Sequence, residues 1–122
     1  MARFLIIDDS ELSRFIVREA LEEAGHTIVG DASDGAEGFE KFKELRPDIT
    51  TLDITMPVMD GIETLERILE IDPNAKVIML SASAQNSKIS EALILGAFEF
   101  LQKPFEKELL LQIVSDILSG AQ

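Results

Sequence analysis

The sequence predicts an α/β protein with a doubly wound, five-stranded parallel sheet and five helices. Five short apolar runs, typical of strands buried on both faces, alternate with amphipathic stretches of helical period. Capping residues precede several of these stretches, and glycine or proline follows them. The chain has 122 residues and shows no linker or repeat, so we expect one domain over residues 1–122.

The apolar runs are the expected strands. They span Arg3–Ile7, His26–Gly30, Asp48–Leu52, Lys76–Leu80 and Phe98–Leu101. Right-handed crossovers between parallel strands place helices on both faces of the sheet. Ligands of such folds bind at the carboxyl ends of the strands, where the winding direction reverses. Functional residues are therefore expected directly after the strands.

The first helix is expected to begin near Ser10, which can act as its cap, and to end at Gly25. Leu12, Ile16 and Ala20 recur every four residues, and we expect them to form its apolar face.

The second and third helices begin at acidic capping pairs, which are Asp34 with Glu37 and Asp60 with Glu63. Their expected apolar positions are Phe39, Phe42, Leu45, Leu65, Ile68 and Leu69. A fourth helix is expected over residues 86–95, and a fifth from the residues after Pro104 to about residue 118.

The composition excludes several classes of site and partner. The chain has no cysteine, so disulfides, thiolate metal sites and cysteine nucleophiles are excluded. Its formal net charge of -12 would repel nucleic-acid backbones and anionic membranes, so we expect neither as a partner. The apolar run near the start is too brief for a signal peptide or a membrane span, and we expect a cytoplasmic protein.

Three of the expected strands lead into ionisable residues. The first runs into Asp8 and Asp9, the third into Asp53, and the fifth leads to Lys103 and Pro104. If the strands are parallel, these carboxylates and the ammonium meet in one cleft. Like charges raise each other's cost of ionisation, and a hard cation such as Mg²⁺ would offset that repulsion. A lysine beside the cation would suit a phosphoryl group.

Ser81 ends the fourth expected strand, where its hydroxyl can donate a hydrogen bond to an anion. It has no visible general base, because the one histidine, His26, lies at the start of a strand and so at the opposite end of the sheet. A Ser–His hydrolase is therefore excluded. The proline after Lys103 raises the expectation of a cis peptide bond there.

Together these motifs resemble the receiver domain of bacterial response regulators. The matching elements are Asp8-Asp9, Asp53 with Met56-Pro57 and Asp60-Gly61, Ser81-Ala82 and Lys103-Pro104. The resemblance covers essentially the whole chain, in order and with similar spacing, and is greatest to free-standing chemotaxis regulators. It implies the strand order 2-1-3-4-5, which is known for this family and does not follow from the sequence pattern itself.

By that resemblance, Asp53 is the phosphoacceptor, which attacks a phosphohistidine on a sensor histidine kinase or phosphotransfer protein. Asp9 and Asp53 are implied as Mg²⁺ ligands, together with the backbone carbonyl of Thr55, while Asp8 acts mostly through water. Phosphoryl transfer needs alignment and charge neutralisation more than a strong base. The chain would be a switch that catalyses only its own phosphorylation and autodephosphorylation.

Lys103 and Ser81 are implied to hold phosphoryl oxygens, and Ser81 and Phe100 to move when the domain switches. Many relatives have threonine and tyrosine at these last two positions; serine keeps the donor, whereas phenylalanine lacks the phenolic hydroxyl. Thr55 and Ser83 flank the site, and we expect them to influence the lifetime of the acyl phosphate by altering water access.

Output is expected through a downstream target protein. Ile94 lies off the buried side of the fourth helix and Leu111 on the flank of the fifth, so we expect a docking or dimerisation surface across the fourth helix, fifth strand and fifth helix. The alternative is that these are ordinary exposed apolar side chains. We expect a monomer or a weak dimer.

Other functions remain open at this point. A phosphorelay intermediate would pass its phosphoryl group onward. A Mg²⁺-dependent phosphatase of the haloacid dehalogenase class needs a second aspartate two residues after its nucleophile, where this chain has Thr55. A flavin carrier needs a phosphate-binding loop rich in Ser, Thr or Gly after the first strand, and the chain has Asp8-Asp9-Ser10-Glu11 there. The intact acidic set argues against a degenerate receiver that serves only as a scaffold.

Overall fold

The computed structural model describes residues 1–82 and 86–120, and five parallel strands form one sheet in the order β2-β1-β3-β4-β5. The strands are β1 (Arg3–Ile7), β2 (Thr27–Ala32), β3 (Ile49–Asp53), β4 (Lys76–Ser81) and β5 (Glu99–Gln102). The helices are α1 (Glu11–Glu23), α2 (Gly35–Leu45), α3 (Gly61–Ile71), α4 (Asn86–Leu95) and α5 (Lys107–Leu118). The predicted fold class and the implied strand order are confirmed.

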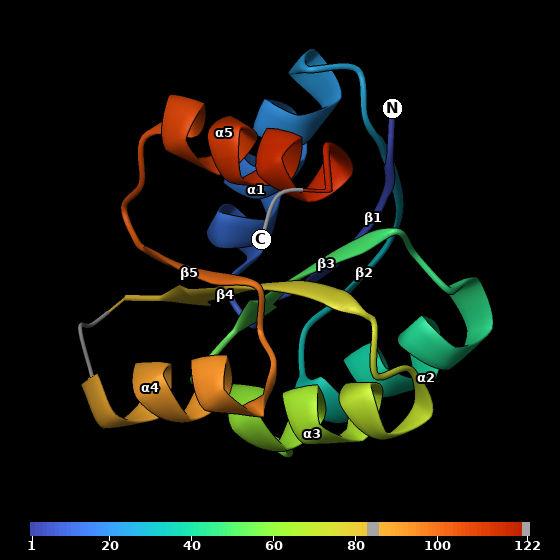
Figure 1. Ribbon diagram of the computed structural model, residues 1–122, viewed down its shortest axis with the longest axis vertical. Helices are drawn as coiled ribbons and strands as arrows, with labels where there is room; N and C mark the ends of the chain where they lie inside the picture. The colour runs from blue at the N-terminus through green and yellow to red at the C-terminus, as the bar shows by residue number, and fades with distance from the viewer. Residues whose placement is uncertain (83–85, 121–122) are drawn as a thin grey trace.

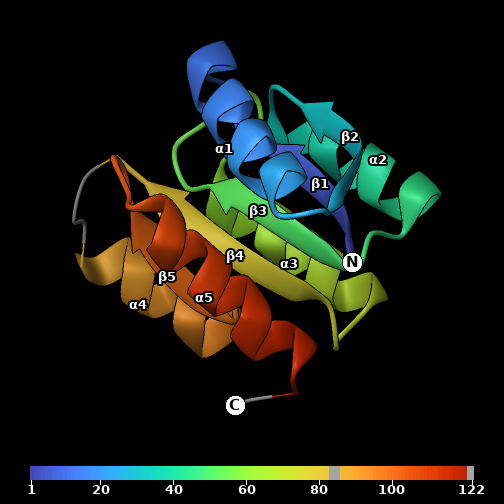
Figure 2. The ribbon, with the colours of Figure 1, turned by 90° about the horizontal axis from the view of Figure 1, so that it is seen from above.

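Helices cover both faces of the sheet (Figure 1). α1 and α5 lie on one face, while α2, α3 and α4 lie on the other, and the view from above shows α1 and α5 together in front of the strands (Figure 2). Phe4 and Ile6 of β1 pack in the α1/α5 core, whereas Leu5 and Ile7 pack in the core beneath α2, α3 and α4. Burial on both faces explains why β1 is a continuous apolar run.

Side-chain caps begin α1, α2 and α3. The oxygens of Ser10, Asp34 and Asp60 accept hydrogen bonds from the backbone N–H groups of Ser13, Glu37 and Glu63, at 3.1, 2.8 and 3.0 Å. Each cap satisfies an amide that lacks a partner within the helix. Because α1 and α3 follow the carboxyl ends of β1 and β3, two of these caps also order the chain around the cleft described below.

The apolar face predicted for α1 is wrong in its first half. Leu12 and Ile16 are 67% and 46% exposed, whereas Val17, Ala20 and Leu21 are buried. The first turns of α1 border a hollow of about 480 Å³ that is lined by Leu12, Ser13, Ile16, Val17, Ala82, Lys103, Pro104 and Phe105. The helical period predicted for α1 was correct. However, the helix carries two apolar stripes, one with Leu12 and Ile16 and one with Val17 and Leu21, and tertiary packing decides which of them is buried.

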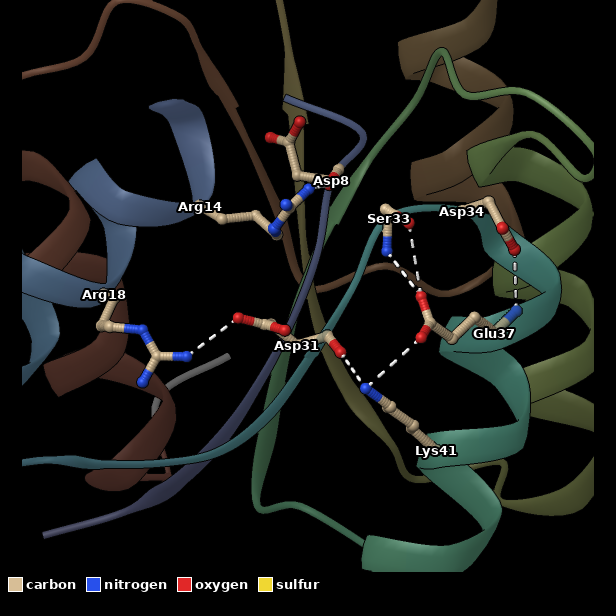
Figure 3. Close-up of polar contacts among 8 residues, drawn as sticks. All are labelled: Asp8, Arg14, Arg18, Asp31, Ser33, Asp34, Glu37 and Lys41. Atoms are coloured by element: carbon tan, nitrogen blue, oxygen red, sulfur yellow. Dashed lines mark hydrogen bonds and ion pairs between the residues drawn. The ribbon is translucent and has the colours of Figure 1, made fainter. Parts of the chain in front are cut away.

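β2 continues past its predicted end at Gly30, to Ala32. Its pairing with β1 has a register shift at Val29, after which Asp31 pairs within the sheet. The Asp31 carboxylate forms an ion pair with Arg18 of α1 at 2.9 Å (Figure 3). Glycine and aspartate disfavour strands when considered locally, and pairing with β1 overrides that preference.

No helix within residues 1–82 and 86–120 combines the length and the apolar character that crossing a membrane requires.

Two buried hydroxyls of β3, on Thr50 and Thr51, have no hydrogen-bond partner among the described residues. Thr51 lies in register between Ile6 and Ile78. Valine keeps the shape of threonine and removes the unpaired hydroxyl, so we expect Thr51→Val to raise the free energy of unfolding by about 1 kcal/mol. Urea unfolding followed by circular dichroism measures this change, and an unchanged or lower midpoint would contradict it.

Candidate functional site: an acidic cleft at the carboxyl edge of the sheet

The carboxyl ends of the strands gather the acidic residues into one cleft. Carboxylate oxygens of Asp8, Asp9 and Asp53 lie within 4.8 Å of one another. The adjoining hollow of about 430 Å³ is lined by Asp9, Ser10, Ser13, Asp53, Thr55, Ser81, Ala82 and Lys103. The structure therefore brings together the acids, the serine and the lysine that the sequence placed at strand ends.

The three carboxylates differ in exposure and in hydrogen bonding. Asp8 is fully buried, Asp53 is 6% exposed, and Asp9 is exposed. One oxygen of Asp8 accepts a hydrogen bond from the Ser10 N–H at 2.9 Å, and the other accepts one from Lys103 Nζ at 2.8 Å. Asp9 and Asp53 line the hollow, so they are the carboxylates that can meet a ligand there directly.

Lys103 brings the positive charge into the cleft. Its Nζ lies 2.8 Å from Asp8 Oδ2, 3.2 Å from Ser13 Oγ and 3.6 Å from Asp53 Oδ1, and its side chain is 16% exposed. The peptide bond between Lys103 and Pro104 is cis, as the sequence suggested. One ammonium therefore faces two buried carboxylates.

This shortage of positive charge affects the protonation of Asp53. The pKa of Asp53 is raised to about 7, mainly by burial and next by the charge of Asp8. Lys103 lowers this pKa, and Asp9 raises it. A cation that enters the cleft would stabilise the ionised form of Asp53. The donor set is made of oxygens and is rich in carboxylates, which fits a hard divalent ion such as Mg²⁺.

Close backbone packing positions Asp53. A Cβ on Gly61 would overlap the carbonyl oxygen of Asp53 and would lie 2.7 Å from Ile54 Cα. The Gly61 N–H donates to the Ile54 carbonyl at 2.7 Å. Only glycine allows α3 to begin this close to β3, so the Asp60-Gly61 pair both caps the helix and holds the chain next to Asp53.

Figure 3 draws polar contacts of α1, β2 and α2, and one of them reaches the end of β1 beside the cleft. The Arg14 guanidinium donates to the backbone carbonyl of Asp8 at 2.6 Å, which ties α1 to the end of β1. On α2, Glu37 accepts a hydrogen bond from the Ser33 N–H at 2.9 Å and pairs with Lys41 at 3.5 Å. Sequence reasoning missed Arg14 and Ser13, because both have the appearance of ordinary surface residues of an amphipathic helix.

The remaining residues singled out from the sequence have these positions. Ser81 is 4% exposed at the end of β4, and Thr55 is exposed; both line the cleft. Phe100 is half-buried on β5, and Ser83 lies outside the described residues. His26 precedes β2 and its Nδ1 accepts a hydrogen bond from the Ala2 N–H, so it lies at the other end of the sheet from Ser81, as expected.

The two residues expected on a partner surface lie in different environments. Ile94 is 85% exposed on α4. Leu111 differs from the prediction: it is half-buried against the α1/α5 core and lines a hollow with Ala24 and His26. Leu111 therefore faces the α1 side of α5 and does not extend the surface that Ile94 occupies.

The chain belongs to the response regulator receiver domain family, whose sequence model matches residues 4–115. Receiver domains of this family are phosphoacceptor switches of two-component systems, and they bind Mg²⁺ at the acidic pocket.

The relatives include chemotaxis proteins. The chain is 42% identical over 115 residues to chemotaxis protein CheY of Thermotoga maritima, covering 94% of this chain and 96% of that protein. It is 48% identical over 118 residues to protein CcdB of Bacillus subtilis, which covers 97% of this chain and 98% of that protein. The fold matches a chain of the CheX–CheY–BeF3–Mg complex of Borrelia burgdorferi with a TM-score of 0.91 and 40% identity, over 95% of this chain and 88% of that one.

The stability of the metal-free protein should fall as the pH rises through about 7. The pKa of Asp53 is raised from 3.8 to about 7, so the folded state holds a proton over a range where the unfolded state has lost it. The stabilisation due to this proton is fully present below the unfolded pKa and is lost as the pH rises through the folded pKa. Urea midpoints measured with a chelator between about pH 5.5 and 8.5 will show this fall.

Asp53→Asn is the control for this titration, because asparagine carries no ionisable proton. The fall in urea midpoint across neutral pH should be much smaller for this variant than for the wild type. Added Mg²⁺ should restore the stability of the wild type at the high-pH end of the range. Equal pH slopes for the wild type and Asp53→Asn would contradict the assignment.

Proposed function

We propose that the chain is a single receiver domain over residues 1–122, that Asp53 is its phosphoacceptor, and that phosphorylation switches its binding to a target protein. The cluster of Asp8, Asp9 and Asp53 within 4.8 Å, with the Lys103 ammonium 3.6 Å from an Asp53 oxygen, carries this proposal. A carboxylate that lines an open hollow beside such charges is suited to accept a phosphoryl group.

The proposed reaction is a direct phosphoryl transfer. An Asp53 oxygen forms a bond to the phosphorus of a phosphohistidine on a sensor kinase or phosphotransfer protein, while the bond from phosphorus to the imidazole nitrogen breaks and its electron pair leaves with the imidazole. Lys103 neutralises one phosphoryl oxygen, and the Ser81 hydroxyl donates a hydrogen bond to another. Asp53 attacks as a carboxylate, so the step needs no general base.

Asp9, Asp53 and the carbonyl of Thr55 would hold Mg²⁺, and Asp8 would act through water. Asp8 suits the indirect role, because its two oxygens already accept hydrogen bonds from Ser10 and Lys103. Bound Mg²⁺ supplies charge neutralisation and alignment of the phosphoryl oxygens. The raised pKa of Asp53 supports this assignment, since the metal would supply the positive charge that the cleft lacks.

The switch would connect the cleft to the surface of α4 and β5. Ser81 at the end of β4 would move toward the phosphoryl group, and the half-buried Phe100 on the neighbouring strand would turn inward. New bonds to the phosphoryl group would shift the balance between two packed arrangements that differ by a few kcal/mol. Ile94 would then contribute to the docking surface for the target.

Thr55 lines the cleft and would tune the lifetime of the acyl phosphate. The same role for Ser83 stays a prediction. Autodephosphorylation and a monomeric or weakly dimeric state also stay predictions. A cytoplasmic location likewise stays a prediction of the sequence.

Incubation with acetyl phosphate and Mg²⁺ should add the mass of one phosphoryl group to the wild-type chain. Asp53→Asn should abolish the addition, because the amide is not a nucleophile, whereas Asp116→Asn on α5 should leave it intact. Intact-protein mass spectrometry measures the product, and omission of Mg²⁺ should slow its formation strongly. A phosphoryl group that persists in Asp53→Asn, or sustained turnover of external phosphomonoesters, would contradict the proposal.

Ile94→Asp should weaken target binding without unfolding the chain, because Ile94 is 85% exposed. Immobilised protein loaded with beryllofluoride and Mg²⁺ is used to capture proteins from the native host, and the bands that depend on loading are quantified. Leu118→Asp, at a position 49% exposed near the end of α5, is the matched control. Equal capture by Ile94→Asp and the wild type would show that Ile94 is an ordinary exposed side chain.

A further inference from the structure

The Lys103 ammonium has a neutral partner in addition to the carboxylates. Its Nζ lies 2.8 Å from Asp8 Oδ2 and 3.2 Å from Ser13 Oγ, whereas Asp53 Oδ1, at 3.6 Å, is beyond hydrogen-bond distance. An ammonium can only donate, so the Ser13 oxygen is the acceptor. Two of its three N–H groups are thus engaged toward β1 and α1, which leaves, within the described part of the chain, one donor for the Asp53 side.

Ser13 is itself held in place at the start of α1. Its backbone N–H donates to the capping oxygen of Ser10 at 3.1 Å. The guanidinium of the next residue, Arg14, donates to the backbone carbonyl of Asp8 at 2.6 Å. The first turn of α1 is therefore fixed to the end of β1, and the backbone that carries the Ser13 hydroxyl is held in place beside the flexible side chain of Lys103.

We propose that Ser13 is a positioning residue for the phosphoryl-transfer site: its hydroxyl holds the Lys103 ammonium over the cleft, where its third donor meets a phosphoryl oxygen on Asp53. This inference rests on the proposed function of Asp53 and adds to it a residue of α1 that contacts no reacting atom.

A hydroxyl is suited to this task because it directs the ammonium without adding negative charge to a cleft that already holds three carboxylates. Lysine carries a long stem with several rotatable bonds, so its ammonium needs more than one partner to be confined. Without Ser13, the ammonium can turn toward Asp53 and pair with the carboxylate. The lysine would then occupy the oxygen that has to attack phosphorus, and its alignment with the phosphoryl group would be lost.

The first test compares phosphorylation by acetyl phosphate in saturating Mg²⁺. We expect Ser13→Ala to lower the maximal rate about tenfold, the size expected for one hydrogen bond to a charged group. The half-saturating concentrations of acetyl phosphate and Mg²⁺ should stay within about twofold, since Ser13 is not expected to bind either. Ser13→Thr, which keeps the hydroxyl, should retain most of the rate, and Ser115→Ala on the exposed side of α5 should retain all of it.

A double-mutant cycle separates positioning from a structural effect on α1. In a Lys103→Gln background there is no ammonium to hold, so adding Ser13→Ala should change the remaining rate by less than about twofold. An effect of α1 packing would instead multiply the rate loss in both backgrounds. An unchanged rate in Ser13→Ala, or an equal loss with and without Lys103, would overturn the inference.

A readout that needs no phosphorylation distinguishes this inference from the proposed function. In ¹⁵N-detected spectra of the unphosphorylated protein, the Lys103 ammonium should shift and exchange its protons faster in Ser13→Ala than in the wild type or Ser115→Ala. An unchanged ammonium signal would overturn the positioning role even if Asp53 accepts phosphate. If the wild type takes up no phosphoryl group at Asp53, the proposed function fails by itself, while the ammonium signal still decides whether Ser13 holds Lys103.

Discussion

The confinement of three carboxylates in one cleft, with one ammonium facing two of them, is the interaction on which the rest of this structure depends. Parallel pairing of β1, β3 and β4 brings the ends of the strands to one edge and forces Asp8, Asp9 and Asp53 to within 4.8 Å. Such crowding is costly in free energy, because each charge raises the cost of ionising its neighbours. Two apolar cores, one on each face of the sheet, hold the backbone rigid enough to sustain it.

In the proposed function, the same electrostatic cost would provide the means of regulation. A cleft short of positive charge would favour the uptake of a divalent cation, and it would favour a phosphoryl group only when the cation and Lys103 are both in place. The elements around the cleft are held by short-range features, such as the contact of Gly61 with the Asp53 backbone and the cap at Asp60. In the proposed switch, rigid elements around this unbalanced set of charges would allow a small chemical change to shift the packing of β4 and β5.

Lys103 links parts of the chain that are far apart in the sequence. It follows β5, yet its ammonium contacts Asp8 at the end of β1 and Ser13 in the first turn of α1. Arg14 then joins that turn to the Asp8 carbonyl. The acidic cleft is thus braced from the α1 side, whereas the surface that carries Ile94 lies on α4. These two sides of the molecule can serve different purposes.

The sequence by itself determined the alternation of strands and helices, the caps of α1, α2 and α3, and the placement of Asp8, Asp53 and Lys103 at the carboxyl ends of strands. These features follow from local periodicity, local hydrogen bonds and the order of residues along the chain. Only the tertiary structure decided which stripe of α1 is buried, that Leu111 faces α1, and that Ser13 holds the ammonium of a lysine 90 positions away. Those outcomes depend on contacts between distant segments, which no local pattern encodes.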